Sequence, residues 1–351
     1  MNKLLHTLIR TSLAAKESDW ATKARQQLSA ATEMEWQETI ETLALHRLLP
    51  VVFYAVKTHS LIDAVPQPYL AQLQEEYHQT YIKNKLLLLS LDGILKVMKA
   101  RDLHPVLWKG IVLADSFYPD LGMRSMGDID FAIASHEINT VTATFKTLGF
   151  LPQENKETEE ALYFVNQMGV FCDVHHRVRL FEGKESMNLT LDLKPHHMNS
   201  PVLKVLEPNA MLVHLIFHMD GHRDETGYLL SWILDVAFVL RKWGDLLNLE
   251  QIEQLMPGKE HVISMFRILR FLEQELGQKL PDSLAKKARN FKQLTLEEIL
   301  RKRRLAIWEL PSPRGWLRLG ACKLAIWPRE NRPYPYLSDL LLWPADSLLN
   351  L

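Results

Sequence analysis

Two aspartates separated by a single residue, Asp128 and Asp130, lie in a segment where polar and apolar residues alternate. In a β-strand alternate side chains share a face, so both carboxylates point to one side while Ile129 and Phe131 point into the core. Adjacent carboxylates repel each other, and a divalent cation between them removes that cost. Because Mg²⁺ is held by one or two carboxylates and by substrate phosphates, the pair predicts a Mg²⁺ site, with Mn²⁺ as the alternative ion.

A third aspartate, Asp173, lies in a second alternating segment, residues 170–176, where it shares a face with His175. If this strand neighbours the first, Asp173 joins the other two carboxylates. Three carboxylates around two metal ions are the arrangement for in-line phosphoryl or nucleotidyl transfer. The predicted catalytic and metal-binding residues are therefore Asp128, Asp130 and Asp173. An Asp-X-Asp pair also occurs by chance in many proteins, so the surrounding residues must decide between these interpretations.

A strand that ends in Lys109-Gly110 and enters a helix precedes these segments. A glycine at this place allows close approach of the backbone to a ligand, and the N-terminus of a helix favours phosphate oxygens. Lys109 and Arg124 can then neutralise a triphosphate. A Lys-Gly pair after a strand is by itself only a weak sign of phosphate binding.

The elements expected around these residues alternate between strand and helix. Strands are expected at 104–108 and 128–134, helices at 109–117 and 136–148, and a hairpin at 161–176. This order predicts a small mixed sheet with helices packed on it, and hence an α+β fold.

Helical periodicity continues on both sides of this core. Arg10 interrupts the apolar stretch that a signal peptide needs, so the N-terminus is interpreted as an amphipathic helix. The predicted division is an N-terminal helical region at 1–98, the α/β core at 99–180 and a C-terminal helical region at 181–351. A basic helical segment at 301–304 is interpreted as a solvated face, with RNA or an anionic membrane surface as the alternative. The Trp-rich tail that follows shows little periodicity.

The composition is that of an ordinary globular protein. The chain has 351 residues, of which 47% are hydrophobic and 24% charged, with a net charge of −1. This balance gives no general case for nucleic-acid binding, so RNA stays a possible but less favoured partner. Two cysteines are too few for a disulfide framework or a cysteine-based zinc site, which fits a cytoplasmic protein. No apolar run is long enough to span a membrane.

Three histidines, His214, His218 and His222, recur every four residues and therefore form one stripe on a helix. One interpretation is a wall of the active site that touches the nucleotide or the acceptor. The other is a set of structural histidines bonded to backbone or carboxylates. A zinc-protease motif is excluded because Leu215 stands where that motif needs Glu. An HD-type phosphohydrolase needs an adjacent His-Asp pair, which this helix lacks.

Several motifs together resemble a known family. They are Leu107–Ala114, Tyr118-Pro119, Met123–Asp130, Asp173-Val174-His175, the His-rich segment Leu212–His222 and Trp232–Asp235. In this order they resemble the bacterial "uncharacterised nucleotidyltransferase" family of the DNA polymerase beta-like nucleotidyltransferase superfamily. The likeness extends from about Trp36 to Leu240.

Three features depart from the superfamily pattern. Gly-Ser or Gly-Gly usually follows the first strand, whereas this chain has Lys109-Gly110; the distance from there to Asp128 is also somewhat long. Ser125 stands where the family often has Pro. Because the usual serine hydroxyl is missing, we expect Lys109 to take over part of the phosphate binding.

The resemblance implies transfer of a nucleoside monophosphate from an NTP to a hydroxyl-bearing acceptor, with release of pyrophosphate. The acceptor is a small molecule, a peptide or a protein, and its identity stays open. Asp128 and Asp130 would hold both metal ions, while Asp173 would bind the catalytic ion and help to deprotonate the acceptor. The expected nucleotide-binding residues are Lys109, Gly110, Arg124, Ser125, His175, His218 and His222.

Three other functions compete with this one. An RNA- or tRNA-directed nucleotidyltransferase is opposed by the near-neutral charge. A non-catalytic nucleotide-binding module is opposed by the presence of all three carboxylates. A kinase ranks last because the Gly-rich loop and the catalytic-loop motif of kinases are absent from the sequence.

Overall fold

The computed structural model describes residues 3–16, 19–153, 161–176, 189–200 and 202–308. The described residues form two compact units, each of which joins segments that are distant in the sequence. Within the described residues, the first unit draws on the chain up to Tyr77, on His218–Ala237 and on the chain from Ser264 onward, and the second on the chain from His78 to Phe217 and on Phe238–Ile263. The expected three-part division stays a prediction.

The second unit contains one mixed sheet, whose seven strands in the described residues follow the order β3-β4-β5-β2-β1-β7-β6. Neighbouring strands β2 and β5 are parallel, as are β1 and β7, and the other pairs are antiparallel. The strands are β1 Val106–Leu107, β2 Ile129–Ala132, β3 Phe150–Pro152, β4 Ala161–Asn166, β5 Phe171–His175, β6 Thr190–Leu193 and β7 Leu203–Leu206. This sheet, with helices on both sides of it in the chain, confirms the predicted α+β class.

The second unit also contains helices, of which α6 and α7 lie between strands in the chain. Its helices are α6 Lys109–Ser116, α7 Ile138–Thr147 and α10 Leu249–Leu255, with the short 3₁₀ helices η2 Ser135–Glu137 and η6 Gly244–Leu246. Four longer helices have residues in both units: α5 Gln67–Ala100, α8 Pro208–Thr226, α9 Leu230–Trp243 and α11 Lys259–Gln274. Helix α7 corresponds to the helix predicted at 136–148, and Gly149 follows it with a φ of +78°, which only glycine adopts readily.

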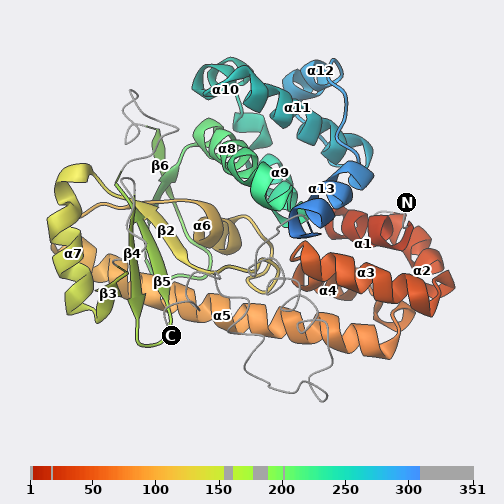
Figure 1. Ribbon diagram of the computed structural model, residues 1–351, viewed down its shortest axis with the longest axis horizontal. Coiled ribbons are helices and arrows are strands. Elements are labelled where there is room, and N and C mark those ends of the chain that lie inside the picture. The colour runs from red at the N-terminus through yellow and green to blue at the C-terminus, as the bar shows by residue number, and fades with distance from the viewer. Residues whose placement is uncertain (1–2, 17–18, 154–160, 177–188, 201, 309–351) are drawn as a thin grey trace. The chain divides into compact units, whose positions relative to one another are not determined.

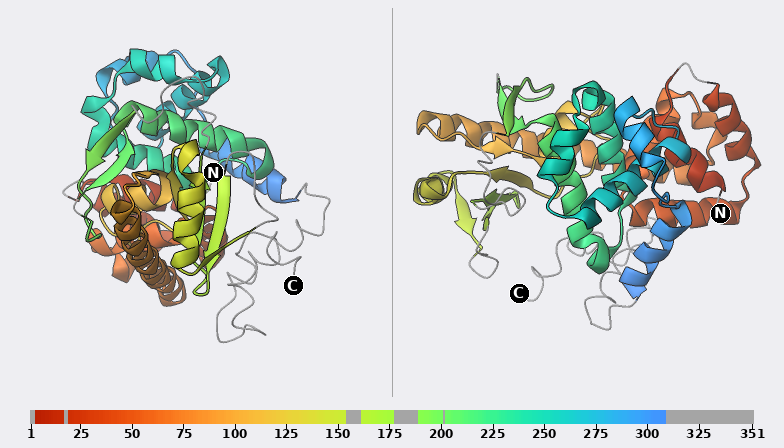
Figure 2. Two further views of the ribbon diagram at one scale, coloured as in Figure 1. Left: turned by 90° about the vertical axis from the view of Figure 1, so that its left-hand side faces the viewer. Right: turned by 90° about the horizontal axis from the view of Figure 1, so that it is seen from above.

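One face of the sheet is apolar and covered by α7, which lies along β3 to β5 (Figure 1, Figure 2). Phe145 of α7 packs on Phe131 of β2 and Phe164 of β4, with ring centroids 5.9 and 4.6 Å away. Alternate residues of β5, Cys172 and Val174, are fully buried on the same side. Because side chains alternate between the two faces of a strand, Asp173 and His175 of β5 lie on the opposite, polar face of the sheet.

The predicted hairpin is present, and it carries the strand expected to complete the site. Strands β4 and β5 pair antiparallel, and the turn between them contains Gly169 with a φ of +75°. Strand β5 then pairs in parallel with β2, which places Asp173 opposite Asp130 and His175 opposite Ala132. The two strands are therefore neighbours, which is the condition for Asp173 to lie beside Asp130.

The first unit is helical in its described residues. Its complete helices are α1 Lys3–Leu13, α2 Trp20–Ala30, α3 Glu33–Leu45, α4 Leu49–Thr58, α12 Asp282–Ala288 and α13 Leu296–Trp308, with the 3₁₀ helix η1 Ile62–Ala64. The expected amphipathic helix at the N-terminus is α1, which buries Leu4, Leu5 and Leu8. A capping box between Thr32 and Glu35 starts α3. The expected Trp-rich tail beyond 308 lies outside the described residues.

No single helix among the described residues is long and apolar enough to cross a membrane. Among the described residues, only α3 and α4 taken together have the length and composition of a membrane span, and the two helices are bent by 120° relative to each other.

A buried carboxylate, Asp115 of α6, ties a distant segment to this helix. Asp115 has no exposed surface, and its oxygens accept the backbone N–H groups of His196 and His197 at 2.9 and 2.8 Å. The hydroxyl of Ser116 donates to it as well, at 2.6 Å. Because α6 begins at Lys109, this tether also helps to fix the predicted phosphate-binding segment.

We expect Asp115→Ala to lower the free energy of unfolding by about 2–4 kcal/mol, because it leaves buried donors without an acceptor. Asp192→Ala, which removes an exposed carboxylate on β6, should change it by less than about 0.5 kcal/mol. Urea unfolding followed by circular dichroism measures both. Equal midpoints for the two variants would contradict the tethering role.

Candidate active site

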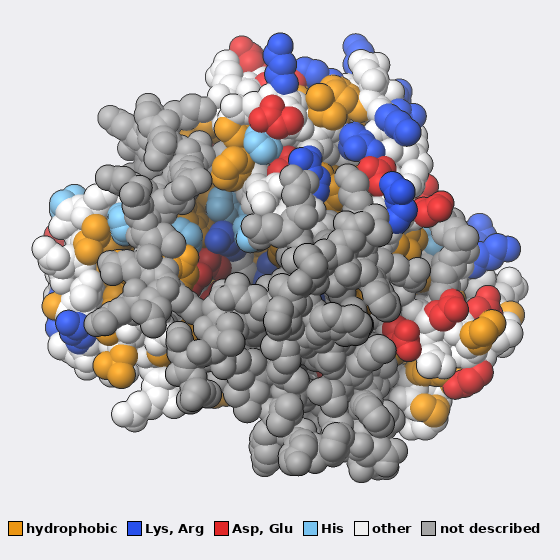
Figure 3. All heavy atoms as spheres, in the orientation of Figure 1, with side chains coloured by type: hydrophobic (Ala, Val, Ile, Leu, Met, Phe, Trp, Pro, Cys, Tyr) orange, Lys and Arg blue, Asp and Glu red, His pale blue; other side chains and the backbone are white. Residues whose placement is uncertain are grey.

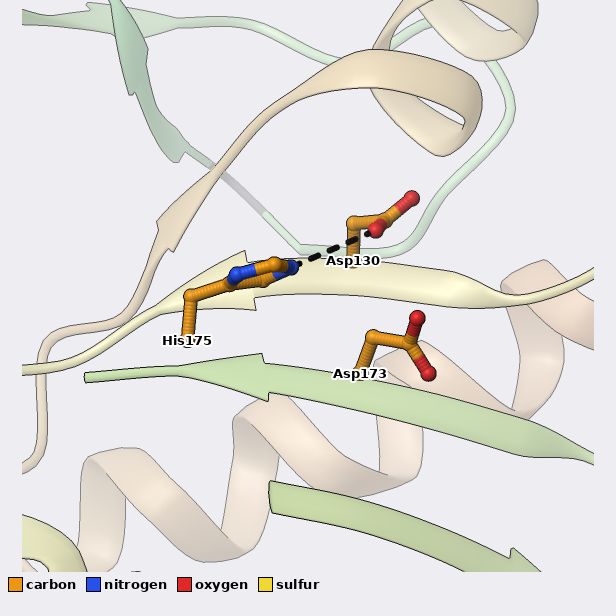
Figure 4. Close-up of side chains that lie close together, drawn as sticks. All are labelled: Asp130, Asp173 and His175. Carbon is orange, nitrogen blue, oxygen red and sulfur yellow. Dashed lines mark ion pairs between the residues drawn. The ribbon is translucent and has the colours of Figure 1, made fainter. Parts of the chain in front are cut away.

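Three side chains that could bind a metal ion meet on the polar face of strands β2 and β5. Asp130 is 5% exposed, whereas Asp173 and His175 are half-buried. One donor atom from each, a carboxylate oxygen or an imidazole nitrogen, lies within 4.8 Å of the other two. Figure 4 shows the ring of His175 directed toward Asp130, with Asp173 on the neighbouring strand.

Two cationic or polar groups stabilise the ionised form of Asp130. Burial raises the pKa of this carboxyl. The ammonium of Lys109, whose Nζ lies 3.0 Å from Oδ1, and the imidazole of His175 together lower the pKa by more than burial raises it. The net effect holds the pKa of Asp130 well below its usual range. For Lys109, burial lowers the pKa, and the carboxylate of Asp130 more than restores it, so that the ammonium is retained. The pair is fully ionised at neutral pH.

Lys109 combines this ion pair with an uncommon backbone conformation. It is the first residue of α6, and its φ of +50° lies in the left-handed region. This conformation costs an L-residue with a side chain roughly 1–2 kcal/mol, whereas glycine adopts it freely. Glycine is what the superfamily usually has after the first strand, so the departure seen in the sequence has a structural counterpart. The strain is offset by the ion pair that the lysine side chain makes.

Gly110 permits the close approach of a guanidinium to the start of α6. A Cβ atom on this residue would lie 3.1 Å from Nη1 of Arg124 and 3.7 Å from Sδ of Met126. The structure therefore brings together Lys109, Gly110 and Arg124, three of the residues expected to bind phosphates. Ser125, the next residue of the loop, is exposed.

Sequence reasoning missed Asn84 of α5, which holds the loop that contains Leu121 and Arg124. Its side chain is fully buried, and Nδ2 donates to the carbonyl oxygens of Leu121 and Arg124, each at 2.7 Å. A signal was present in the sequence, because Asn84 is a polar residue in a helical stripe whose other members, such as Leu87 and Leu91, are buried.

Sequence reasoning also missed an aromatic support beneath the metal-binding side chains. Trp108, which is 2% exposed, meets the ring of His175 edge-on at 5.2 Å and stacks on the ring of His214 at 5.2 Å. His214, one of the three histidines in the helical stripe, therefore contacts the site indirectly, through the ring of Trp108.

The other two histidines of the stripe belong to the first unit. His218 and His222 lie on the later part of α8, with ring centroids 5.0 and 5.7 Å from Trp232. Their expected contact with the nucleotide stays a prediction.

Asp128 lies directly before β2 and is half-buried. It is not part of the group formed by Asp130, Asp173 and His175, but its negative charge helps to raise the pKa of Lys109. Burial, reinforced by the carboxylates of Asp173, Asp128 and Asp130, raises the pKa of the free Cys172 thiol. Whether Asp128 binds a metal ion stays a prediction.

These observations agree with a comparison of the whole chain with known families. A family model described as "Uncharacterised nucleotidyltransferase" matches residues 32–257, which is more than half of the chain. The chain belongs to this nucleotidyltransferase family. The resemblance inferred from the motifs is thereby confirmed, and the protein is a nucleotidyltransferase. No curated protein matches the chain.

Solved structures of nucleotidyltransferases resemble this one. The solution structure of the antibiotic-resistance factor ANT(2'')-Ia is 13% identical, with a TM-score of 0.38, and the match covers 48% of this chain and 88% of that one. A crystal structure of ANT(2'')-Ia with adenylyl-2''-tobramycin is 14% identical, with a TM-score of 0.36, and covers 46% and 90%. An antigenic nucleotidyltransferase-like protein from Paracoccidioides brasiliensis is 13% identical, with a TM-score of 0.39, and covers 57% and 94%.

The donor set of this nucleotidyltransferase fits a divalent cation. Two carboxylates face each other across parallel strands, which is the arrangement that a shared cation stabilises. The Nε2 atom of His175 is buried and has no hydrogen-bond partner among the described residues. A buried nitrogen without a partner costs free energy, and a metal ion would satisfy it. Figure 3 shows several histidine side chains close to a few acidic and basic ones left of the centre of the view.

We expect Lys109→Met to lower the free energy of unfolding by about 3 kcal/mol without divalent cations, because it leaves Asp130 without its nearest counter-charge. Added Mn²⁺ should stabilise this variant more than the wild type, since the ion takes the place of the ammonium. Thermal unfolding with and without Mn²⁺ measures both effects. The matched control is Lys204→Met, which removes an exposed lysine on β7; a Lys109→Met protein as stable as this control would contradict the role of the ion pair.

Proposed function

We propose that this nucleotidyltransferase moves a nucleoside monophosphate from an NTP to a hydroxyl-bearing acceptor and releases pyrophosphate. One observation carries the proposal: Asp130 and Asp173 lie side by side on parallel strands, with Lys109 at the start of α6 beside them. Phosphoryl transfer needs little more from a protein than positioning and neutralisation of charge, and this arrangement supplies both.

The cation in this proposal is Mg²⁺, with Mn²⁺ as the alternative, and Asp130 and Asp173 would hold it with help from Asp128. When bound, the cation neutralises charge on the triphosphate and on the leaving pyrophosphate. The low pKa of Asp130 supports this role, because the carboxylate is ionised at any pH where the enzyme works.

The remaining groups of the site bind and orient the substrates. Lys109 and Arg124 bind the triphosphate, and the free N–H groups at the start of α6 add to the binding of its oxygens. The acceptor oxygen attacks the α-phosphorus, the bond from that phosphorus to the bridging oxygen breaks, and pyrophosphate leaves. Asp173 takes the proton of the acceptor hydroxyl. Ser125, His218 and His222 are proposed to contact the nucleotide.

ATP is the NTP we propose to test first, and the acceptor is a small molecule, a peptide or a protein. A cytoplasmic location is proposed from the cysteine content, since the chain has two cysteines and that of β5 is a buried free thiol.

The function is tested with ATP labelled on either the α or the γ phosphate, in a lysate of the host organism. We expect label to arrive from the α position only. Asp130→Asn and Asp173→Asn should each lower the transfer about 1000-fold, since roughly 4 kcal/mol of stabilisation of the transition state is lost. Asp192→Asn, at an exposed carboxylate on β6, is the matched control and should keep full transfer.

Label from the γ position would mean a kinase and would contradict the proposal. Transfer from the α position that survives in Asp130→Asn would contradict the assigned site. No transfer with any of the four NTPs and either Mg²⁺ or Mn²⁺ would favour a nucleotide-binding module.

Asn84→Ala tests how the loop that carries Arg124 is held. Without the two donated hydrogen bonds the loop is freer, so we expect about 10-fold weaker binding of ATP, or about 1.4 kcal/mol. Isothermal titration calorimetry measures this affinity, with Asn139→Ala, at an exposed position of α7, as the control. Unchanged affinity in Asn84→Ala would contradict the role.

A further inference from the structure

We propose that His175 is a ligand of the cation, so that Asp130, Asp173 and His175 form a mixed nitrogen–oxygen site that binds Mn²⁺ more tightly than Mg²⁺. This inference rests on the proposed function, because it concerns the same cation. It changes the role of His175, which the sequence suggested as a contact to the nucleotide, and it names the class of ion that the site selects.

The position of His175 on the sheet makes it a ligand rather than a distant neighbour. It follows Asp173 by two residues on β5, so both side chains share a face, and it lies opposite Ala132 of β2. Because Ala132 has only a methyl group, the imidazole can lean across β2. Figure 4 shows the ring directed toward Asp130 in this way.

The distances between the donor atoms suit one shared ion. Nε2 of His175 lies 3.7 Å from Oδ1 of Asp130, which is too long for a hydrogen bond. Two ligands at about 2.1 Å from one ion are roughly 3 to 4.2 Å apart, for adjacent and opposite positions of an octahedron. The full set of donor atoms lies within 4.8 Å, so a small inward movement completes the coordination.

The surroundings of the ring favour a fixed orientation with Nε2 free to bind. Trp108 meets the ring edge-on and is itself stacked on His214, so the imidazole is supported by two further rings. Nε2 is buried and lacks a hydrogen-bond partner in the part of the chain that the structure describes.

The chemistry of the donors then selects the ion. Mg²⁺ is a hard cation that prefers oxygen and keeps several water ligands. Imidazole suits first-row transition ions, whereas the two carboxylates suit Mg²⁺ and Mn²⁺ alike, so the imidazole sets the preference. A site with one imidazole and two carboxylates is therefore expected to prefer Mn²⁺ to Mg²⁺.

Electron paramagnetic resonance of the full-length protein loaded with Mn²⁺ tests this directly. Electron spin echo modulation detects nitrogen bound to Mn²⁺, so the wild type should show ¹⁴N modulation. In His175→Gln we expect loss of that modulation and about 10- to 100-fold weaker Mn²⁺ binding. Binding of Mg²⁺, measured by competition, should fall by less than about 3-fold. His136→Gln, at an exposed histidine of η2, is the control and should leave the modulation and both affinities unchanged.

A second variant, His175→Asp, guards against a folding defect. It puts a carboxylate ligand in place of the imidazole, so it should still bind Mn²⁺ while the nitrogen modulation disappears.

Nitrogen modulation that persists in both variants would overturn the inference, because another nitrogen would then be the ligand. Mn²⁺ binding without nitrogen modulation in the wild type would overturn it as well and would leave the proposed function intact. Failure of the proposed function looks different, since transfer of the α label is then absent whatever the spectrum shows.

Discussion

The repulsion between two carboxylates on adjacent parallel strands is the constraint on which the rest of this site depends. Asp130 and Asp173 are paired in register, and Asp130 is buried. Two charges in this position are stable only when a positive charge lies close to them. In the described structure that charge is the ammonium of Lys109, 3.0 Å from Asp130. The start of α6 is therefore fixed by electrostatics as well as by packing.

This requirement explains why a strained residue is retained at the start of α6. Lys109 has a φ of +50°, which glycine would adopt at no cost, but glycine could not supply an ammonium. Strain of this kind persists where the surrounding structure determines the conformation. Here the tether made by Asp115 and the close contact of Gly110 with Arg124 hold the same segment from two sides. The site combines local strain with firm support.

The two faces of the sheet have different roles, one in packing and the other in carrying the site residues. One face is a core of aromatic rings, in which Phe145 of α7 packs on Phe131 and Phe164, and it fixes the positions of the strands. The other face carries the carboxylates and His175, with Trp108 against the ring. Precise placement of charged groups requires such a rigid support, because small displacements of catalytic groups are costly. The apolar side chains of each strand thus fix the positions of the polar side chains on its other face.

The sequence by itself determined which side chains of each strand share a face, because that depends only on the alternation of neighbours. It also determined the family, since motifs such as Lys109-Gly110 and Asp173-Val174-His175 are local. Only the tertiary structure decided that β2 pairs with β5, and that Asn84 holds the loop of Arg124. It alone showed the strands β6 and β7, in a region where helices were expected. Pairing of distant segments depends on the packing of the whole chain, which local periodicity does not encode.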